Sequence, residues 1–287
     1  MTILPSAGLR ARVALDKHSF RTTHSLGQNF LLDDRFLSGL LDKTGVHSGD
    51  RVLEIGPGAG VMTALIAERA EKVCAVELDQ RLEPVLRDVL QPYSNAEVVF
   101  CDFLKADVNR LLKDAFGAHE YRVIANLPYY ITADILMRLV TSERPPESIS
   151  IMVQKEAAER IMSEPGEKQW CALAATNRIY GRAEVLEEVP PERFDPAPHV
   201  DSCFIQIQKH ESPIVESEML PMLRRTIQCA FAMRRKTLAN NLKASFGLSG
   251  TQAGEILNRC RLPATVRGES LDINALYRVS QALNEML

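Results

Sequence analysis

The 287-residue sequence lacks the features that mark several common classes of protein. Its six cysteines, at positions 74, 101, 171, 203, 229 and 260, include no C-x-x-C pair. This disfavours a zinc site and a disulfide framework, and it fits a reducing compartment. No apolar run approaches the roughly 20 residues needed to cross a bilayer, and the N-terminus lacks a continuous signal-peptide core. We therefore expect a cytoplasmic monomer that binds neither a metal nor a membrane.

An excess of positive charge is also missing, because 34 lysines and arginines stand against 37 acidic residues and leave a formal net charge of −3. This total mildly disfavours a nucleic-acid-binding protein. Residues 1–24 depart from it, since they contain four basic residues and one acidic residue. We expect this segment to be a flexible basic arm that is either held by an anionic partner or simply solvated.

The order of the predicted elements indicates the fold class. Strand-like apolar segments alternate with helical segments, the strands lying at 51–55, 72–78, 96–100, 121–126 and 148–154. Such alternation is typical of an α/β protein with a mostly parallel sheet that helices cover on both faces. Two more strand-like segments, 183–189 and 201–209, predict a terminal antiparallel pair and bring the sheet to seven strands.

The chain is longer than a usual domain of about 100 to 150 residues, which predicts a large domain and a smaller one. From residue 216 onward almost every segment has helical periodicity. We expect a Rossmann-like domain over residues 25–211 and a small all-helical domain over residues 212–287.

A glycine-rich turn follows the first predicted strand. In an open parallel sheet, ligands bind beyond the carboxyl ends of the strands. The turn, EIGPGAG, contains Gly56 and Gly58, which let the backbone approach a ligand closely. Val61 stands where the dinucleotide fingerprint G-x-G-x-x-G has a small residue, and no phosphate-binding lysine follows. Dinucleotides and ATP are therefore disfavoured.

Acidic residues at the ends of the next two strands indicate an adenosyl ligand. Glu77 lies 21 residues past Gly56, where a carboxylate can accept hydrogen bonds from both ribose hydroxyls. Asp102 follows the third strand, where its carboxylate can accept an amino proton of adenine beside Phe103. Each of these residues could instead be an ordinary strand end or helix cap. Together they favour S-adenosylmethionine and a class I S-adenosylmethionine-dependent methyltransferase.

The fourth predicted strand runs into Asn126, Leu127, Pro128 and Tyr129. The N6 amine of adenine is a poor nucleophile, because its lone pair is delocalised into the ring. Acceptors for both amine protons would free that lone pair, and Asn126 offers a side-chain oxygen while the Leu127-Pro128 segment offers a backbone carbonyl. Tyr129 can stack on the base. The corner predicts a clamp for a flipped adenine, against the alternative of a turn with a core tyrosine.

The chain resembles the ribosomal RNA adenine N6,N6-dimethyltransferases of the KsgA/RsmA type from about residue 24 to the C-terminus. The matching segments, in the order of the family, are HSLGQNFL (24–31), EIGPGAG (54–60), VELD (76–79), NLPYYI (126–131), MVQKE (152–156), FDPAPHVDS (194–202) and RRKTLANNL (234–242). Two segments depart from the family pattern. ITADIL (131–136) replaces the usual Thr-Pro, and WCALAA (170–175) stands where Tyr-Gly-x-Leu-Ser-Val is common.

The resemblance implies a role for most residues of the predicted site. S-adenosylmethionine would be held by Gln28, Asn29, Leu31, Gly56, Gly58, Glu77, Asp102 and Asn126. The target amine would be held by Asn126 and the Leu127-Pro128 backbone, between the rings of Tyr129 and Phe194. The implied substrate is two adjacent adenines in the 3′-end hairpin of small-subunit (16S) rRNA. Each would receive two methyl groups during ribosome biogenesis.

A basic cluster in the helical domain is the predicted RNA contact. A helix break near Met233 would leave Arg234, Arg235 and Lys236 at a helix start. The macrodipole disfavours cations there, so the cluster indicates an outside anionic partner, with a solvated cluster as the alternative. Two other functions stay open: a large-subunit (23S) rRNA adenine methyltransferase of the macrolide-resistance type, and a non-catalytic RNA-binding assembly factor.

Overall fold

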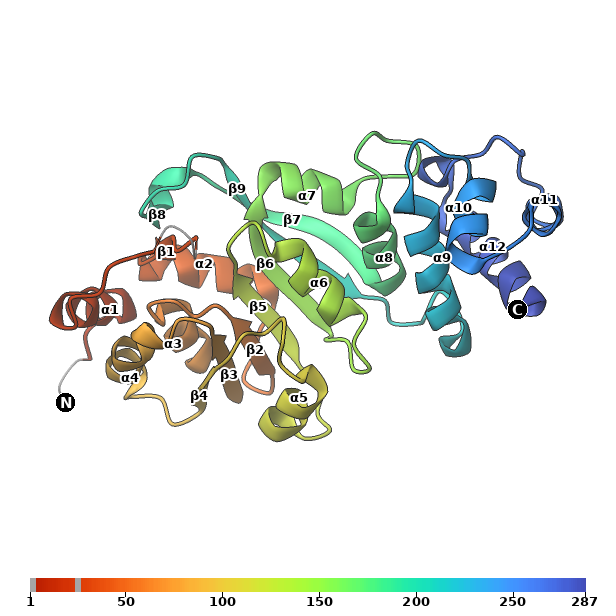
Figure 1. Cartoon of the computed structure of the whole chain (residues 1–287). Helices are drawn as coiled ribbons and strands as arrows, with labels where there is room; N and C mark the ends of the chain where they lie inside the picture. Colours follow the sequence, from red (N-terminus) through yellow and green to blue (C-terminus); the bar gives the residue numbers. More distant parts are fainter. Residues whose placement is uncertain (1–3, 24–26) are drawn as a thin grey trace. The chain divides into compact units, whose positions relative to one another are not determined.

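The apolar strand segments assemble into one sheet in the order β4-β3-β2-β5-β6-β9-β7 (Figure 1). The computed structural model describes residues 4–23 and 27–287. The strands of this sheet are β2 (Arg51–Ile55), β3 (Lys72–Glu77), β4 (Ala96–Phe100), β5 (Arg122–Asn126), β6 (Ser148–Gln154), β7 (Gly181–Val189) and β9 (Ser202–Lys209). β2 pairs in parallel with β3 and β5, whereas β9 runs antiparallel to β6. The predicted mostly parallel sheet of seven strands is confirmed.

The strand order reverses between β2 and β5, which are neighbours in the middle of the sheet. The chain first proceeds outward from β2 through β3 to β4 and then returns to β5 on the other side of β2. Such a reversal opens a crevice at the carboxyl ends of the two central strands. Residues after Ile55 and Asn126 are therefore placed to contact a ligand.

Helices α1 (Ala7–Lys17), α2 (Asp34–Thr44), α3 (Val61–Ala67) and α4 (Glu83–Leu90) form one layer on the sheet. Their apolar side chains share a core with alternate strand residues, among them Val52, Val73 and Ile124. The strand residues that point to the other face, such as Leu53 and Cys74, are buried as well. Both faces are therefore covered, as expected for a parallel sheet. α5 (Val108–Phe116), outside the predicted elements, and α6 (Thr132–Val140) complete the helices of this part.

The expected flexible arm over residues 1–24 is wrong for its central part, because Ala7–Lys17 form helix α1. Ala7, Ala11 and Ala14 are buried, which lets the helix pack closely against α4. The backbone N–H of Gly8 donates to both carboxylate oxygens of Asp34. These small side chains form a buried face of the helix, which a count of charged residues in the segment could not predict. Residues 1–3 and 24 lie outside the described residues.

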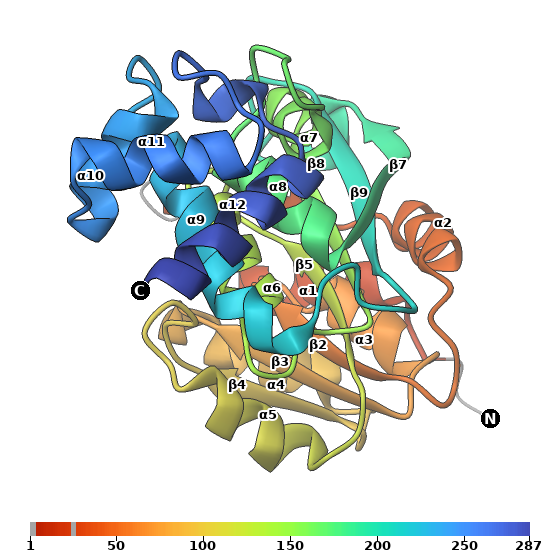
Figure 2. The same ribbon diagram turned by 90° about the vertical axis from the view of Figure 1, so that its right-hand side faces the viewer.

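The chain forms two compact units: Met1–Ala158 with Glu184–Gln208, and Glu159–Ala183 with Lys209–Leu287. The second contains α8 (Ala172–Tyr180), α9 (Leu220–Ala232), α10 (Leu238–Phe246), α11 (Gly250–Arg259) and α12 (Ile273–Met286), and Figure 2 shows α9 to α12 gathered together. α7 (Lys155–Met162) spans the boundary. Within residues 4–23 and 27–287, no helix combines the length and the apolar composition that crossing a membrane requires.

The helical unit is larger than the predicted 212–287 domain, because residues 159–183 join it. The Trp170 side chain is fully buried, and its Nε1 donates to the Leu271 carbonyl at 3.1 Å. Its ring meets that of Phe231 edge-on, with centroids 6.2 Å apart. A buried tryptophan of this size contributes strongly to a small core. The segment around it is therefore part of the helical unit, although it precedes two strands of the sheet.

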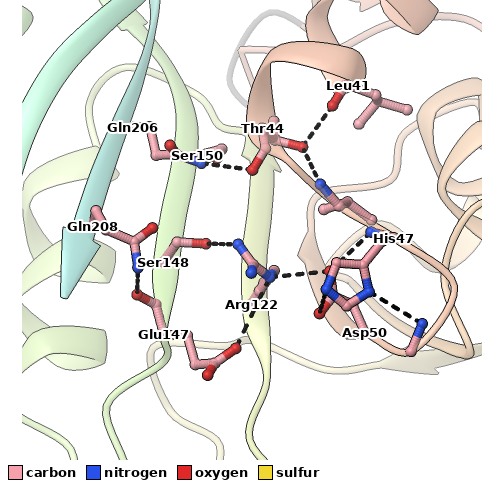
Figure 3. A network of polar contacts seen from close by, with 12 residues as sticks. Leu41, Thr44, His47, Asp50, Arg122, Glu147, Ser148, Ser150, Gln206 and Gln208 are labelled. Carbon is pink, nitrogen blue, oxygen red and sulfur yellow. Dashed lines mark hydrogen bonds and ion pairs between the residues drawn. The ribbon is translucent and has the colours of Figure 1, made fainter. Parts of the chain in front are cut away.

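Polar side chains at the amino ends of the strands satisfy one another (Figure 3). Arg122, at the start of β5, forms ion pairs with Asp50 at 3.1 Å and Glu147 at 3.9 Å. Gln206 donates to the Thr44 carbonyl and to the Ser150 hydroxyl. A buried charge is tolerated when it is paired in this way. This edge of the sheet is held by internal pairs, which contrasts with the opposite edge described next.

Candidate active site

A cavity opens at the carboxyl ends of β2, β3 and β5, with about 1160 Å³ of empty space, part of which is open solvent. Every residue predicted to hold the cofactor or the target base lines it: Gln28, Asn29, Leu31, Gly56, Gly58, Glu77, Asp102, Asn126, Leu127, Pro128, Tyr129 and Phe194. Segments from residue 27 to residue 194 thus meet in one place.

The glycine turn forms the floor of this cavity. Gly56, Gly58 and Gly60 have φ of +75°, +56° and +79°, a region that favours glycine. A Cβ atom on Gly58 would lie 3.0 Å from the Phe30 ring, so the turn and that ring are in close contact. The Gly58 N–H donates to Glu77 Oε2 at 3.1 Å. The turn is therefore held between β3 and the segment that carries Phe30.

Glu77 and Asp102 lie on the wall of the cavity with different local partners. Glu77 Oε1 accepts from the Asp79 N–H at 2.8 Å. Burial raises the pKa of Glu77, although its hydrogen bonds from the Asp79 and Gly58 amides oppose that shift. Asp102 caps its own turn by accepting from the Leu104 N–H, and it pairs with Lys105. Asp102 is not the cap of the next helix, which was the alternative considered for it, because Asp107 is the N-cap of α5.

The Asn126 carboxamide is oriented by the protein. Its Nδ2 donates to the Asn29 carbonyl at 3.3 Å, and among the described residues its Oδ1 accepts no hydrogen bond. The Pro128 carbonyl accepts from the Ile131 N–H and from the Thr132 hydroxyl. Both lone pairs of that oxygen are therefore in use. If this segment offers a backbone acceptor to a ligand, the carbonyl of Leu127 is the better candidate.

Two aromatic residues of the predicted clamp are brought together from distant segments. The Tyr129 hydroxyl hydrogen-bonds the Ser202 hydroxyl at 2.6 Å, which fixes one end of its ring. Phe194 lies on strand β8 (Phe194–Asp195), which pairs antiparallel with β1 (Phe30–Leu31). This small sheet sets Leu31 opposite Phe194. Long-range pairing, which local sequence patterns do not reveal, delivers both residues to the cavity.

The sequence interpretation did not include Glu54 among the site residues, although it starts the EIGPGAG segment. Glu54 is fully buried and lines the cavity, and its Oε2 has no hydrogen-bond partner in the described part of the chain. Burial raises the pKa of Glu54 to about 8; the nearby Thr63 hydroxyl opposes this shift, and the charge of Glu77 adds to it. Most buried polar atoms are paired, so an unpaired carboxyl oxygen needs a reason. An acidic residue inside an apolar strand was the signal available in the sequence.

The predicted RNA-contacting residues lie in the helical unit, in the turn between α9 and α10. α10 begins at Leu238 with Thr237 as its N-cap, so Arg234, Arg235 and Lys236 precede the helix and are not in its first turn. Arg234 donates to the Lys168 carbonyl at 2.9 Å and also lies 3.5 Å from a Glu269 oxygen. All three residues are exposed. Arg234 is therefore a structural donor within this unit.

Comparisons with known proteins agree on one family and one fold. A family model described as ribosomal RNA adenine dimethylase matches residues 19–278. The ribosomal RNA small subunit methyltransferase A of Alkaliphilus metalliredigens is 40% identical over 265 residues, which are 92% of each chain. That of a Geobacillus species is 38% identical over 282 residues, or 97% of each chain.

Two solved structures share the fold. A dimethyladenosine transferase from Plasmodium falciparum has a TM-score of 0.73 at 22% identity, over 88% of this chain and 96% of that one. The 23S rRNA methyltransferase ErmE has a TM-score of 0.64 at 23% identity, over 89% of this chain and all of that one. The predicted class I methyltransferase fold followed by C-terminal helices is confirmed.

Proposed function

Because the chain belongs to the ribosomal RNA adenine dimethylase family, and is therefore an rRNA-methylating enzyme, we propose that it methylates the N6 amines of two adjacent adenines in the 3′-end hairpin of small-subunit (16S) rRNA. Each adenine receives two methyl groups from S-adenosylmethionine. One observation carries this proposal: the residues expected to hold the cofactor and those expected to hold the base line a single cavity. A methyl donor and its acceptor need such a shared space.

The donor groups of the cavity fit S-adenosylmethionine. Gly58 brings backbone close to the ligand, and Glu77 offers a carboxylate suited to ribose hydroxyls. Glu54 offers a buried carboxyl oxygen without a partner among the described residues, which suits the ammonium group at the amino-acid end of the ligand. When bound, the cofactor supplies an electrophilic methyl group on a positively charged sulfur.

Asn126 activates the target amine in this proposal. The hydrogen bond from its Nδ2 to the Asn29 carbonyl leaves Oδ1 to accept one amine proton. The Leu127 carbonyl is the second acceptor, because the Pro128 carbonyl is engaged by Ile131 and Thr132. Two fixed acceptors favour a tetrahedral nitrogen with a localised lone pair, and they need no reorganisation during the reaction.

Tyr129 and Phe194 hold the target base by stacking on its two faces. Burial raises the pKa of Tyr129, so its hydroxyl stays protonated and keeps the short hydrogen bond to Ser202. A fixed aromatic ring is a suitable platform for a flipped base. Phe194 is buried at the β1–β8 pair and borders the same cavity. The two rings would hold the purine between them while Asn126 holds its amine.

The partner in this proposal is the small ribosomal subunit, reached in the cytoplasm, whose reducing conditions suit six free cysteines. Arg235 and Lys236 are the proposed phosphate contacts, because both are exposed and no ion pair involves them in the described part of the chain. Phosphate contacts position a protein on RNA without reading its sequence.

Purified enzyme and tritiated S-adenosylmethionine test the substrate. We expect label in small subunits that lack the modification, and mass spectrometry should find dimethyladenosine in the 3′-end hairpin. Label confined to large subunits would instead establish the 23S enzyme. Cofactor binding without methyl transfer to either subunit would indicate a non-catalytic assembly factor.

The Asn126→Ala substitution should reduce methyl transfer on the order of 100-fold, the cost of losing one preorganised hydrogen bond to a reacting group. Cofactor affinity should stay measurable by calorimetry, because the other cavity residues remain. Asn109→Ala is the matched control, since Asn109 is an exposed residue of α5 away from the cavity lining. Full activity in the Asn126 variant would refute the clamp.

A further inference from the structure

The N-terminal arm is tied to the segment that follows β3, over most of that segment's length. Lys17 and His18 both contact Asp88 of α4, at 2.7 and 2.9 Å. Further back, Arg10 donates to the Val89 carbonyl at 3.3 Å. These contacts hold residues 10–18 of the arm. A different contact holds Phe20 and Thr23, which follow them in the chain.

Arg81 makes that contact with Phe20 and Thr23. It lies in the single 3₁₀ turn η2 (Gln80–Leu82), just after β3. Its Nε and Nη2 donate to the two carboxylate oxygens of Asp79 at 2.8 and 2.6 Å, and Nη2 also donates to the Thr23 hydroxyl at 2.7 Å. The guanidinium carbon lies 5.2 Å from the centroid of the Phe20 ring. One side chain thus binds a strand end and two residues of the arm.

Asp79 and Thr23, the two residues that Arg81 joins, are both hydrogen-bonded to residues of the cavity lining. The Asp79 carboxylate accepts from Gln28 Nε2 at 2.8 Å, and the Asp79 N–H donates to Glu77. Gln28 Oε1 in turn accepts from the Thr23 N–H at 2.9 Å. Both Glu77 and Gln28 line the cavity, whereas Arg81 does not.

An aromatic contact makes a second route from the arm to the cavity. The Phe20 ring, held under Arg81, lies 6.0 Å from the Phe30 ring, centroid to centroid. Phe30 in turn packs against Gly58 of the glycine turn. A shift of the arm would therefore move a ring that lies on the cavity floor.

The geometry requires arginine at this position. A planar fork can bind both oxygens of Asp79, reach Thr23 and stack on Phe20 at once, whereas a lysine ammonium can make only part of these contacts. The Arg81 side chain is 52% exposed, and exposed ion pairs add little to folding stability. Its main effect is therefore on where the arm lies. The hydrogen bond from Arg81 also lowers the pKa of Asp79, which keeps that carboxylate charged.

We propose that Arg81 is a positioning residue that holds Gln28 and Phe30, on the N-terminal side of the cofactor cavity, in the arrangement that binds S-adenosylmethionine. The inference rests on the proposed function, because it takes the cavity to be the cofactor site. Arg81 touches neither the ligand nor the target base. It acts through Gln28 and Glu77 on one side and through Phe20 and Phe30 on the other.

Calorimetry with S-adenosylmethionine tests the proposal on the full chain. Arg81→Ala should weaken binding about tenfold, the size of a lost charged hydrogen bond. Phe20→Ala should weaken binding equally, because it removes the ring that connects Arg81 to Phe30. Arg81→Lys should lose about threefold, because it keeps the charge without the fork. The double variant should lose about tenfold and not the hundredfold of independent sites, because both residues act through one contact. Arg51→Ala, which breaks an exposed pair with Glu71 at the amino end of β2, should bind as the natural protein does.

Kinetics separate positioning from a general loss of structure. In Arg81→Ala the KM for S-adenosylmethionine should rise with the dissociation constant, while kcat at saturating cofactor stays within about twofold. An unchanged dissociation constant, or a kcat that falls as far as the affinity, would overturn the proposal. Absence of binding to the natural protein would overturn the proposed function together with this inference. Binding that Glu77→Ala weakens and Arg81→Ala leaves intact would overturn this inference alone.

Discussion

Glu54 Oε2 and Asn126 Oδ1 are two polar atoms of cavity-lining residues for which the described chain supplies no hydrogen-bond partner. Glu54 Oε2 is buried and unpaired, and Asn126 Oδ1 is aimed by a hydrogen bond on the other end of its carboxamide. At the amino ends of the same strands, Arg122 is paired with Asp50 and Glu147. The open acceptors at the cavity edge are what the proposed cofactor and target amine would need.

The Glu54 carboxyl should make stability depend on pH. Folding raises its pKa from 4.5 to about 8, because burial disfavours the charged form. Between those two values the folded protein keeps a proton that the unfolded chain has lost, so the contribution of Glu54 to the unfolding free energy falls as pH rises. Glu54→Gln should therefore gain stability relative to the natural protein from pH 5 to pH 8.

Urea denaturation at several pH values measures this difference without cofactor. Glu147→Gln is a matched control, since Glu147 is a more exposed carboxylate at the opposite edge of the sheet. A constant stability difference between Glu54→Gln and the natural protein across this range would mean that Glu54 ionises normally.

The elements around the cavity are held by close contacts between segments. The glycine turn packs on Phe30, and β1 pairs with β8 to bring Phe194 in. The departure ITADIL lies at the start of α6, where Ile131 provides no side-chain cap and the Thr132 hydroxyl bonds the Pro128 carbonyl. Thr132 therefore ties this helix to the Asn126–Tyr129 corner, at the position where the family has Thr-Pro. WCALAA lies at Trp170 and α8, in the helical unit, where it serves packing.

The Gly58→Ala substitution should weaken cofactor binding as well as stability. A left-handed backbone costs an alanine about 1–2 kcal/mol, and the new Cβ would also press on the Phe30 ring. Gly45→Ala is the matched control, because Gly45 has φ +70° at the end of α2 and open space around its Cβ position. Gly58→Ala should lose more stability in urea than Gly45→Ala, because only its Cβ meets a ring, and calorimetry should find weaker S-adenosylmethionine binding only for Gly58→Ala. Equal affinities of the two variants for S-adenosylmethionine would mean that the glycine turn does not contact the cofactor.

At the scale of the whole molecule, a net charge of −3 gives no general attraction to RNA. Binding must then depend on local clusters. Several cations that composition would count toward RNA are engaged internally, since Arg10 and Lys17 bind α4 and Arg234 binds Lys168 and Glu269. Arg235 and Lys236 are the exposed remainder of the predicted cluster.

Arg235→Ala and Lys236→Ala should each reduce the salt dependence of rRNA binding by about one unit of slope in log K against log salt, as expected for one lost phosphate contact. Arg234→Ala should instead lower stability, because it leaves the Lys168 carbonyl without its donor. Lys113→Ala, an exposed lysine of α5, is the control. Filter binding over a range of salt concentrations measures the slopes. Equal slopes of log K against log salt for the four variants and the natural protein would mean that Arg235 and Lys236 do not contact rRNA phosphates.

The sequence by itself determined the elements whose signal is local. The bounds of β2, β4 and β6 agree with the predicted 51–55, 96–100 and 148–154, because apolar spacing is a property of neighbouring residues. The glycine turn, Glu77, Asp102 and Asn126 could be placed on one cavity for the same reason, since each follows a strand and parallel strands end on one edge.

Only the tertiary structure decided which polar atoms are already engaged. Periodicity could not show that the arm folds as α1 on small buried alanines, that Trp170 joins the helical unit, or that the Pro128 carbonyl is taken. Nor could it show that Arg81 joins the arm to the cavity wall. These contacts link residues far apart along the chain or depend on the directions of individual hydrogen bonds. Neither quantity is encoded in local spacing, because both follow from how the whole chain packs.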